Sequence, residues 1–243
     1  MTHGRIGRPP GQSIDNADRR RRQLFEAAID SIVQYGFAGT TLARVSAAAG
    51  VSQGTAVFYF KTKEALLEET LKYHYGTYRA VWQTALERAG NDPIERIMAI
   101  VFADLDPAIW TPRTVALWNS FWGEAGARPR LAAICETFDR EWTSALLTQC
   151  KAALTEFDGP VWTPEALLAA LGAITDGLWH RMHISPGSIG AAEGRLLLAR
   201  VLASAFPKQA DRILAKTKRL NRSLAQPRGR AISKGKRERR AHP

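Results

Sequence analysis

The stretch TTLARVSAAAGVSQGTAVFYFKTKEALL, residues 40–67, decides how the N-terminal part of the chain folds. It predicts two short helices, over 40–49 and 52–59, that meet at a tight turn. Gly50 supplies the positive φ that such a turn needs. Ser52 follows at once and is a good N-cap for the second helix, because its hydroxyl accepts from a free backbone N–H of the first turn.

The second of these helices is too short and too polar to be a core element. Its N-terminal end carries Gln53, Gly54 and Thr55, and this is the end that a recognition helix presents to base edges in the major groove. Free N–H groups and the positive end of the helix dipole also suit phosphate there. With a further helix expected over 18–36, the segment predicts a helix-turn-helix that binds DNA.

A longer signature surrounds these helices. It comprises Gly36-Phe37, Thr40-Thr41, Ala49-Gly50-Val51-Ser52, Gly54, Tyr59-Phe60 and Lys63-Glu64-x-Leu66-Leu67. Over residues 18–67 this pattern resembles the DNA-binding signature of the TetR family of transcriptional regulators.

The resemblance implies a role for each matched position. Thr41 and Lys63 would contact phosphates, and Tyr59 would contact the DNA backbone. The residues that would face the bases are Gln53, Gly54 and Thr55, preceded by the cap residue Ser52. One position departs from the pattern, because Val57 stands where many members have tyrosine. Either a phosphate contact is lost there, or the valine touches a thymine methyl group.

Beyond residue 62 the sequence reads as a series of helices, several of which begin at a capping residue followed by proline, as in Asp92-Pro93. The expected helices span 62–89, 93–104, 111–125, 129–156, 164–184 and 188–206. No convincing strand alternation appears. The predicted fold class is all-α, with an N-terminal three-helix helix-turn-helix domain and a C-terminal helical domain for ligand binding and dimerisation.

Charge divides the chain into a near-neutral body and two basic ends. Residues 1–22 carry a net charge of +4 and residues 216–243 a net charge of +10, whereas the part between them carries −3. Such ends bind polyanions or merely solubilise a chain, and charge alone leaves both readings open. The predicted divisions are a flexible basic arm over 1–17, the helix-turn-helix domain over 18–62, the ligand-binding and dimerisation domain over 63–207, and a basic, disordered tail over 208–243.

The helix expected over 164–184 is apolar on more than one face, so it cannot lie on the surface of a monomer. It mixes bulky residues with small ones that let a partner helix approach closely. With the next helix it predicts a four-helix bundle between two copies of the chain. The expected interface residues are Leu171, Ile174, Leu178, Trp179, Val201 and Leu202. A two-fold homodimer then reads a roughly palindromic DNA operator.

A narrower resemblance covers more of the chain. It comprises Trp118-x-x-Phe121-Trp122, Thr175-Asp176-Gly177-Leu178-Trp179-x-Arg181, Arg20-Arg21-Arg22-Gln23-Leu24 and Phe58-Tyr59-Phe60. These segments are similar to those of the choline-responsive BetI group of repressors within the TetR family. The resemblance implies a quaternary ammonium inducer such as choline, and control of choline and glycine betaine metabolism.

The aromatic residues make such an inducer physically reasonable, because an aromatic face stabilises a methylated ammonium by roughly 0.5–2 kcal/mol. The expected pocket residues are Trp110, Trp118, Phe121 and Trp122, among seven tryptophans in the chain. The candidates for a counter-charge are Asp104, Asp106, Glu124 and Asp176. The alternative is that the aromatic rings only pack the core and that Asp176 pairs with an arginine at the interface.

The function predicted from these features is a ligand-responsive transcriptional repressor in the cytoplasm. The alternatives are a regulator of an efflux or other catabolic operon with a different inducer, and a sequence-tolerant DNA-coating protein driven by the basic tail. No catalytic residues, cofactor or metal site are expected, since His180 and His183 lack a third ligand at recognisable spacing. The sequence has neither an apolar run long enough to span a membrane nor the apolar core of a secretory signal.

Overall fold

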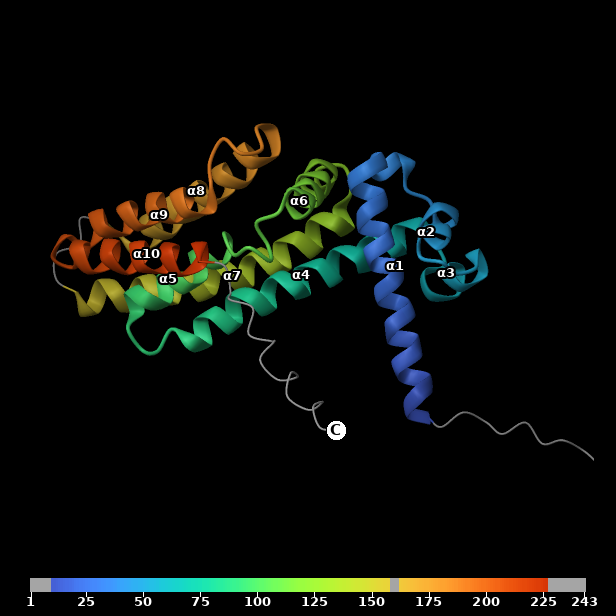
Figure 1. The fold of residues 1–243 in the computed structure, drawn as a ribbon, viewed down its shortest axis with the longest axis horizontal. Helices are drawn as coiled ribbons and strands as arrows, with labels where there is room; N and C mark the ends of the chain where they lie inside the picture. Colours follow the sequence, from blue (N-terminus) through green and yellow to red (C-terminus); the bar gives the residue numbers. More distant parts are fainter. Residues whose placement is uncertain (1–9, 158–161, 227–243) are drawn as a thin grey trace, which may run out of the picture.

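The computed structural model describes residues 10–157 and 162–226, and every regular element in these ranges is a helix. The molecule is elongated, with the helix-turn-helix at one end and the last three α-helices at the other (Figure 1). The predicted all-α fold is confirmed. In the described ranges, no helix combines the length and the apolarity that a membrane crossing requires.

The N-terminal domain consists of α1 (Pro10–Gly39), α2 (Leu42–Ala48) and α3 (Gln53–Phe60). Their apolar faces share a small core with the start of the next helix. Helix α1 begins well before Asp18, so the expected flexible arm is wrong from residue 10 onward, while residues 1–9 lie outside the described part. The chain bends sharply at Gly36, whose φ of 67° suits glycine.

Four helices form the middle of the molecule, namely α4 (Lys63–Arg88), α5 (Pro93–Ala103), α6 (Pro112–Ala125) and α7 (Pro129–Glu156). The capping predictions are confirmed at their starts. Asp92 accepts a hydrogen bond from the Glu95 N–H at 3.0 Å, and Thr111 accepts one from the Thr114 N–H at 3.1 Å. Helices α4 and α7 run along much of the molecule and connect its two ends (Figure 1).

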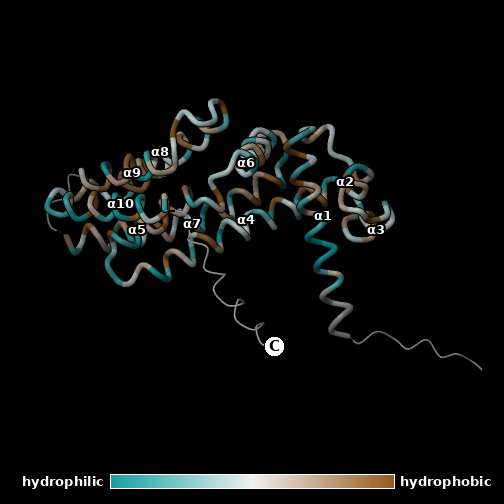
Figure 2. The backbone as a smooth tube through the Cα atoms, in the orientation of Figure 1, coloured by the Kyte–Doolittle hydropathy of each residue, from teal (hydrophilic) through white to brown (hydrophobic). Residues whose placement is uncertain are grey.

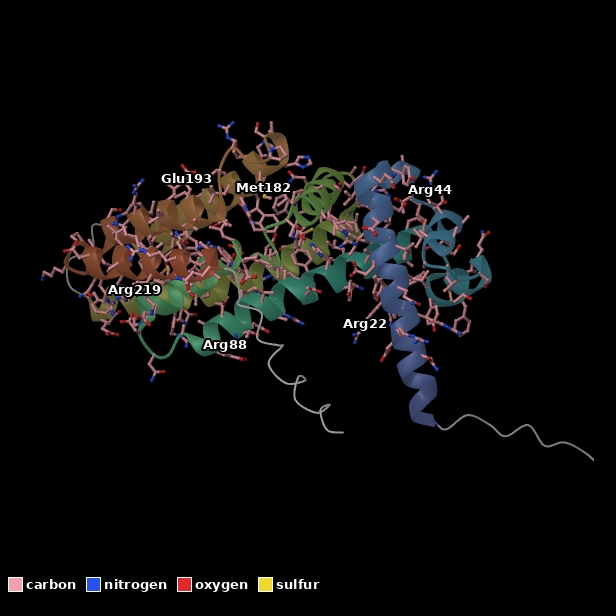
Figure 3. The ribbon with its side chains drawn as sticks, in the orientation of Figure 1. Arg22, Arg44, Arg88, Met182, Glu193 and Arg219 are labelled. Carbon is pink, nitrogen blue, oxygen red and sulfur yellow. The ribbon has the colours of Figure 1, made fainter. Side chains whose placement is uncertain are left out.

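The far end is built from α8 (Pro164–Ile184), α9 (Ala191–Ala205), the short 3₁₀ helix η1 (Pro207–Gln209) and α10 (Ala210–Ala225). The prediction of a disordered tail from residue 208 is wrong over α10, whereas residues 227–243 lie outside the described part. Figure 3 labels Arg219 on α10, near the opposite end of the molecule from Arg44 in the helix-turn-helix.

Helix α10 is ordered because one narrow face of it is buried against α9. Ile213 and Thr217 are 1% and 0% exposed. Two of the helix's cations pair with carboxylates at the start of α5, Arg212 with Asp92 and Lys216 with Glu95. The many positive charges of this segment favour a disordered tail, whereas its few apolar residues form only a short stripe.

Two further cores lie in the C-terminal domain. One is formed mainly by α5, α7, α8 and α9, and the other joins α6 to α1 and α4. Most apolar residues lie where helices pack together, and the N-terminal part of α1 is hydrophilic (Figure 2). The second core matters for function because it places the helix-turn-helix domain directly against α6.

Candidate DNA-binding helices and ligand cavity

The turn between α2 and α3 has the predicted geometry. Gly50 takes a φ of 66°, and the Val51 N–H donates to the Ser46 carbonyl at 3.0 Å. Val51 is partly buried between the two helices. The Ser52 hydroxyl caps α3 by accepting from the Thr55 N–H at 3.1 Å. These contacts fix the angle at which α3 leaves the domain.

The residues expected to contact DNA lie together at this end of the molecule. Thr41, Ser52, Gln53, Gly54 and Val57 are exposed, and Thr55, Tyr59 and Lys63 are partly exposed. All of them are therefore accessible to a duplex, and their individual contacts remain predictions.

Two of the expected phosphate contacts have partners within the free protein. The Thr41 hydroxyl accepts from the Arg44 N–H at 3.1 Å and so caps α2. The Lys63 ammonium donates to the Ala38 carbonyl at 3.3 Å, which ties the start of α4 to the end of α1. The start of α4 is therefore attached to the DNA-binding domain.

Two further residues of this surface are exposed, and neither was predicted to contact DNA from the sequence. The Phe58 side chain is 79% exposed on α3, whereas Ala56 and Phe60 on the same helix are buried. Arg44 on α2 stacks its guanidinium over the Tyr35 ring at 4.2 Å. The helical period places Phe58 on the opposite side of α3 from Ala56 and Phe60, so its exposure could have been predicted from the sequence.

A cavity of about 800 Å³ lies between α4, α6, α7 and α8 in the C-terminal domain. Six aromatic side chains line it, namely Tyr75, Tyr78, Trp118, Trp122, Trp142 and Trp179. Trp118, Trp122 and Trp179 lie next to one another, with ring centroids 5.8–6.4 Å apart. Such a group of rings offers several faces to one ligand.

Three carboxyl groups share this cavity, Asp104 after α5, Asp139 on α7 and Asp176 on α8. Burial raises the pKa of all three, and for Asp104 to about 8. The Tyr78 hydroxyl donates to Oδ1 of Asp104, but Oδ2 of this side chain has no hydrogen-bond partner among the described residues. The Tyr75 hydroxyl donates to Asp139 at 3.3 Å.

Two of the four aromatic residues expected in the pocket do line the cavity, Trp118 and Trp122. Trp110 and Phe121 do not line it. Phe121 is fully buried and packs edge-on against Phe37 of α1 at 5.0 Å, because it lies on the side of α6 that faces the DNA-binding domain. Trp110 packs behind Trp179, at a centroid distance of 6.3 Å, without lining the cavity.

The proposed counter-charges divide in the same way. Asp104 and Asp176 lie in the cavity, whereas Asp106 accepts a backbone hydrogen bond from Ala108 and Glu124 pairs with Arg128 at 2.6 Å. Asp139, Trp142 and both tyrosines were missed. Nothing in the sequences of α4 and α7 indicates that these residues face a cavity. The cavity forms only where α4 and α7 pack against α6 and α8.

Comparison with known proteins assigns the chain to a family. Residues 24–70 match the bacterial regulatory proteins of the tetR family, and residues 93–207 match the C-terminal domain of BetI-type transcriptional repressors. The chain is 33% identical to the HTH-type transcriptional regulator BetI of Paraburkholderia xenovorans (strain LB400), over 68% of this chain and 83% of that protein. The chain belongs to the TetR family.

Other relatives agree with this assignment. The BetI regulator of Stenotrophomonas maltophilia (strain R551-3) is 30% identical over 72% of this chain and 87% of its own length. Among solved structures, a transcriptional regulator from Pseudomonas aeruginosa PAO1 has the same fold, with a TM-score of 0.71, 21% identity, and coverage of 81% of this chain and 94% of that one. A regulator from Saccharomonospora viridis, in complex with choline, has a TM-score of 0.67 at 18% identity and covers 75% and 95%.

This TetR-family chain is a BetI-type transcriptional repressor and not an enzyme. Among the described residues, no group of three histidine, cysteine, aspartate or glutamate side chains is placed to hold a metal ion. Helix α10 lies beyond the part of the chain that matches the BetI-type domain, which ends at residue 207.

The structure corrects the residues expected at the dimer interface of this repressor. Leu171, Leu178 and Leu202 are at most 5% exposed inside the protomer, and Trp179 lies in the cavity wall. Ile174 and Val201 are partly exposed and stay predicted interface residues. The helical period explains the error, because the bulky residues of α8 face the protomer's own core.

The exposed residues of α8 include four small ones, Ala166, Ala169, Ala173 and Gly177, beside charged and polar residues such as Asp176 and Arg181. A Cβ atom built at Gly177 would meet nothing within 4 Å in the protomer. The small residues that suggested close helix packing in the sequence are thus the ones that remain available to a second copy.

Proposed function

We propose that this repressor binds a palindromic operator as a homodimer and leaves it when the cavity takes an organic cation of the quaternary ammonium class. The observation that carries the proposal is one cavity in which three adjacent tryptophans and three aspartates meet. Choline is the first candidate, given the choline complex of the regulator from Saccharomonospora viridis and the relatives named BetI. Control of choline and glycine betaine metabolism follows as part of the same proposal.

The chemistry of the cavity suits a methylated ammonium better than a neutral or anionic ligand. Aromatic faces attract such a cation, by about 2 kcal/mol or more where water is excluded. Carboxylates supply the counter-charge, and no lysine or arginine of the described residues lines the cavity. An anion would meet three carboxyl groups without a compensating cation.

Helix α6 offers a route from the ligand to DNA. Trp118 and Trp122 line the cavity from this helix, and its opposite side contacts α1. Arg113 pairs with Asp30 and Glu26 of α1 at 2.7 and 2.8 Å. Because packed helices shift as units, a ligand that moves the tryptophans changes the position of the DNA-binding domain.

Helix α4 is a second route. Tyr75 and Tyr78 line the cavity from its middle, and Lys63 stands at its first turn. A ligand that displaces α4 would change the separation of two recognition helices in a dimer. That separation must match successive major grooves for both half-sites to be read.

The experiment measures binding to the DNA upstream of the gene, by fluorescence anisotropy at a stated physiological salt concentration. We expect choline to weaken operator binding at least tenfold, while its uncharged isostere 3,3-dimethylbutan-1-ol has no effect. Trp122→Leu should reduce the response to choline. Trp110→Leu is the matched control, because Trp110 does not line the cavity, and it should retain the response.

Two results would contradict the proposal. Equal release by choline and by its neutral isostere would show that charge is not recognised. Equal affinity for the upstream DNA and for random DNA would show that the upstream DNA contains no specific operator. That result would favour a DNA-coating role.

A further inference from the structure

We propose that the cavity of this repressor binds an organic dication, with two cationic groups joined by a spacer, more tightly than a cation with a single ammonium group such as choline. The inference rests on the proposed function, since it concerns the ligand of the same cavity. It is carried by the number, depth and placement of the acidic side chains and by the size of the space that they enclose.

The cavity offers three carboxyl groups, more than a single ammonium group needs as a counter-ion. Asp104, Asp139 and Asp176 come from three separate parts of the fold, and all three line it. The nearby Arg79 is paired outside with Glu141 at 3.1 Å. In the empty cavity protons neutralise part of this acid, because burial raises the pKa of all three carboxyl groups. A second cationic group can take the place of such a proton beside a second carboxylate.

The acidic groups also lie at different depths. Asp104 is 1% exposed, and its Oδ2 has no hydrogen-bond partner in the described part of the chain. Asp176 is exposed on α8, at the rim. Two cationic groups would therefore find two carboxyl partners at different depths, Asp104 inside and Asp176 at the rim, in a cavity that aromatic rings also line.

The volume of the cavity agrees with a ligand of this length. Pockets of 300–1,000 Å³ hold ligands of the size of a drug molecule, and this cavity measures about 800 Å³. A cation as small as choline would leave most of it to water. A spacer lined by Trp118, Trp122 and Trp142 would bury apolar surface that choline does not have.

The test compares bis(trimethylammonium)alkanes of several spacer lengths with alkyltrimethylammonium ions of the same chain lengths. Each pair differs by one cationic group. Binding to the full-length protein is measured by isothermal titration calorimetry at constant ionic strength. We expect the best dication to bind at least tenfold more tightly than its matched monocation, and to release the operator at a correspondingly lower concentration.

Two variants locate the second cationic group. Asp176→Asn should bring the ratio of dication to monocation affinity close to one, because it removes the carboxylate proposed for the second cationic group. The side chain is exposed, so the variant should fold, which circular dichroism checks. Glu136→Gln is the control, because Glu136 lies on α7 outside the cavity and pairs with Arg140; it should leave the ratio unchanged.

Equal affinity of the two members of every pair would overturn the dication, while leaving the cation-responsive repressor intact. An unchanged ratio in Asp176→Asn would overturn the rim position. If no organic cation bound at all, both the dication and the proposed function would fail.

Discussion

At Asp104, burial outweighs the hydrogen bond from Tyr78. The carboxyl group is enclosed by the protein, and its pKa rises to about 8, so in the empty cavity at neutral pH it is mainly protonated. The unfolded chain has its ordinary value near 4 and loses the proton. Between about pH 4 and pH 8 the folded state therefore binds more protons, and the free energy of unfolding falls as pH rises.

Asp104→Asn should remove this dependence, because asparagine keeps an acceptor for Tyr78 and cannot ionise. We expect the variant without ligand to be more stable than the wild type at pH 8 by at least about 1.4 kcal/mol, the equivalent of one pKa unit. The gain should shrink toward pH 4. Urea unfolding of both proteins across this range measures the difference, and His74, whose pKa is lowered to about 4 by burial, contributes equally to both. A stability difference that does not vary with pH would contradict the assignment.

Phe58 is the most exposed large apolar side chain on the helix-turn-helix, at 79%. An exposed phenylalanine on a recognition helix contributes favourable free energy when a partner buries it, roughly 1.5–3 kcal/mol when burial is complete. Phe58→Ala should weaken operator binding about tenfold and leave the melting temperature unchanged. Leu224→Ala removes an exposed apolar side chain from α10 and is the control for both measurements. Unchanged operator affinity in Phe58→Ala would place this residue outside the DNA contact.

At the scale of elements, α10 is a structural brace and not a free basic tail. It packs on α9, and its residue Asn221 accepts from the buried guanidinium of Arg195 at 2.7 Å. Arg195 also donates to the Leu105 carbonyl at 2.7 Å, next to the cavity residue Asp104. The helix thereby supports the chain segment that positions the deepest carboxyl group.

Ile213→Ala tests this role, because it leaves a space between α10 and α9. We expect a loss of about 2–4 kcal/mol in the free energy of unfolding, as for other buried isoleucines. Leu220→Ala, at a position on the same helix that is 37% exposed, should change it by less than about 1 kcal/mol. Equal and small effects of the two substitutions would mean that α10 contributes little to the stability of the domain.

Across the whole molecule, α4 and α7 connect the DNA-binding end with the far end (Figure 1), and α6 packs between α1 and α8. The cavity lies on this connection, so a ligand can reach the recognition helix through packed helices alone. The exposed small-residue face of α8 lies beside the cavity, since Ala173 belongs to both. A second copy packed on this face would therefore also lie close to the bound ligand.

Gly177→Arg tests the proposed homodimer. The protomer has room for the new side chain, whereas a closely packed partner helix would not. We expect the dissociation constant of the dimer, measured by analytical ultracentrifugation, to rise at least tenfold while the helix content stays the same. The affinity for an operator with two half-sites should fall. Gly123→Arg makes the same change at an exposed glycine of α6 with open space around it, and should leave the dimer intact. A Gly177→Arg protein that still dimerises like the wild type would move the interface away from this face of α8.

Local sequence signals were enough to predict the helix-turn-helix, the all-α fold and most helix starts. These features are local, because Gly50 fixes a turn and Ser52, Asp92 and Thr111 each cap the helix that follows them. A resemblance that spans residues 18–67 needs no knowledge of tertiary contacts.

Which side of each helix faces the cavity, the core or a partner depends on how the helices pack together, and local signals do not contain that information. The period of α6 separates Trp118 and Phe121 onto different faces, but it does not say that one face meets α8 and the other meets α1. For the same reason the bulky residues of α8 were assigned to a partner when they belong to the protomer's core. Helix α10 was not predicted, because its sequence is dominated by lysine and arginine. The contacts with α9 and α5 that stabilise it are tertiary contacts.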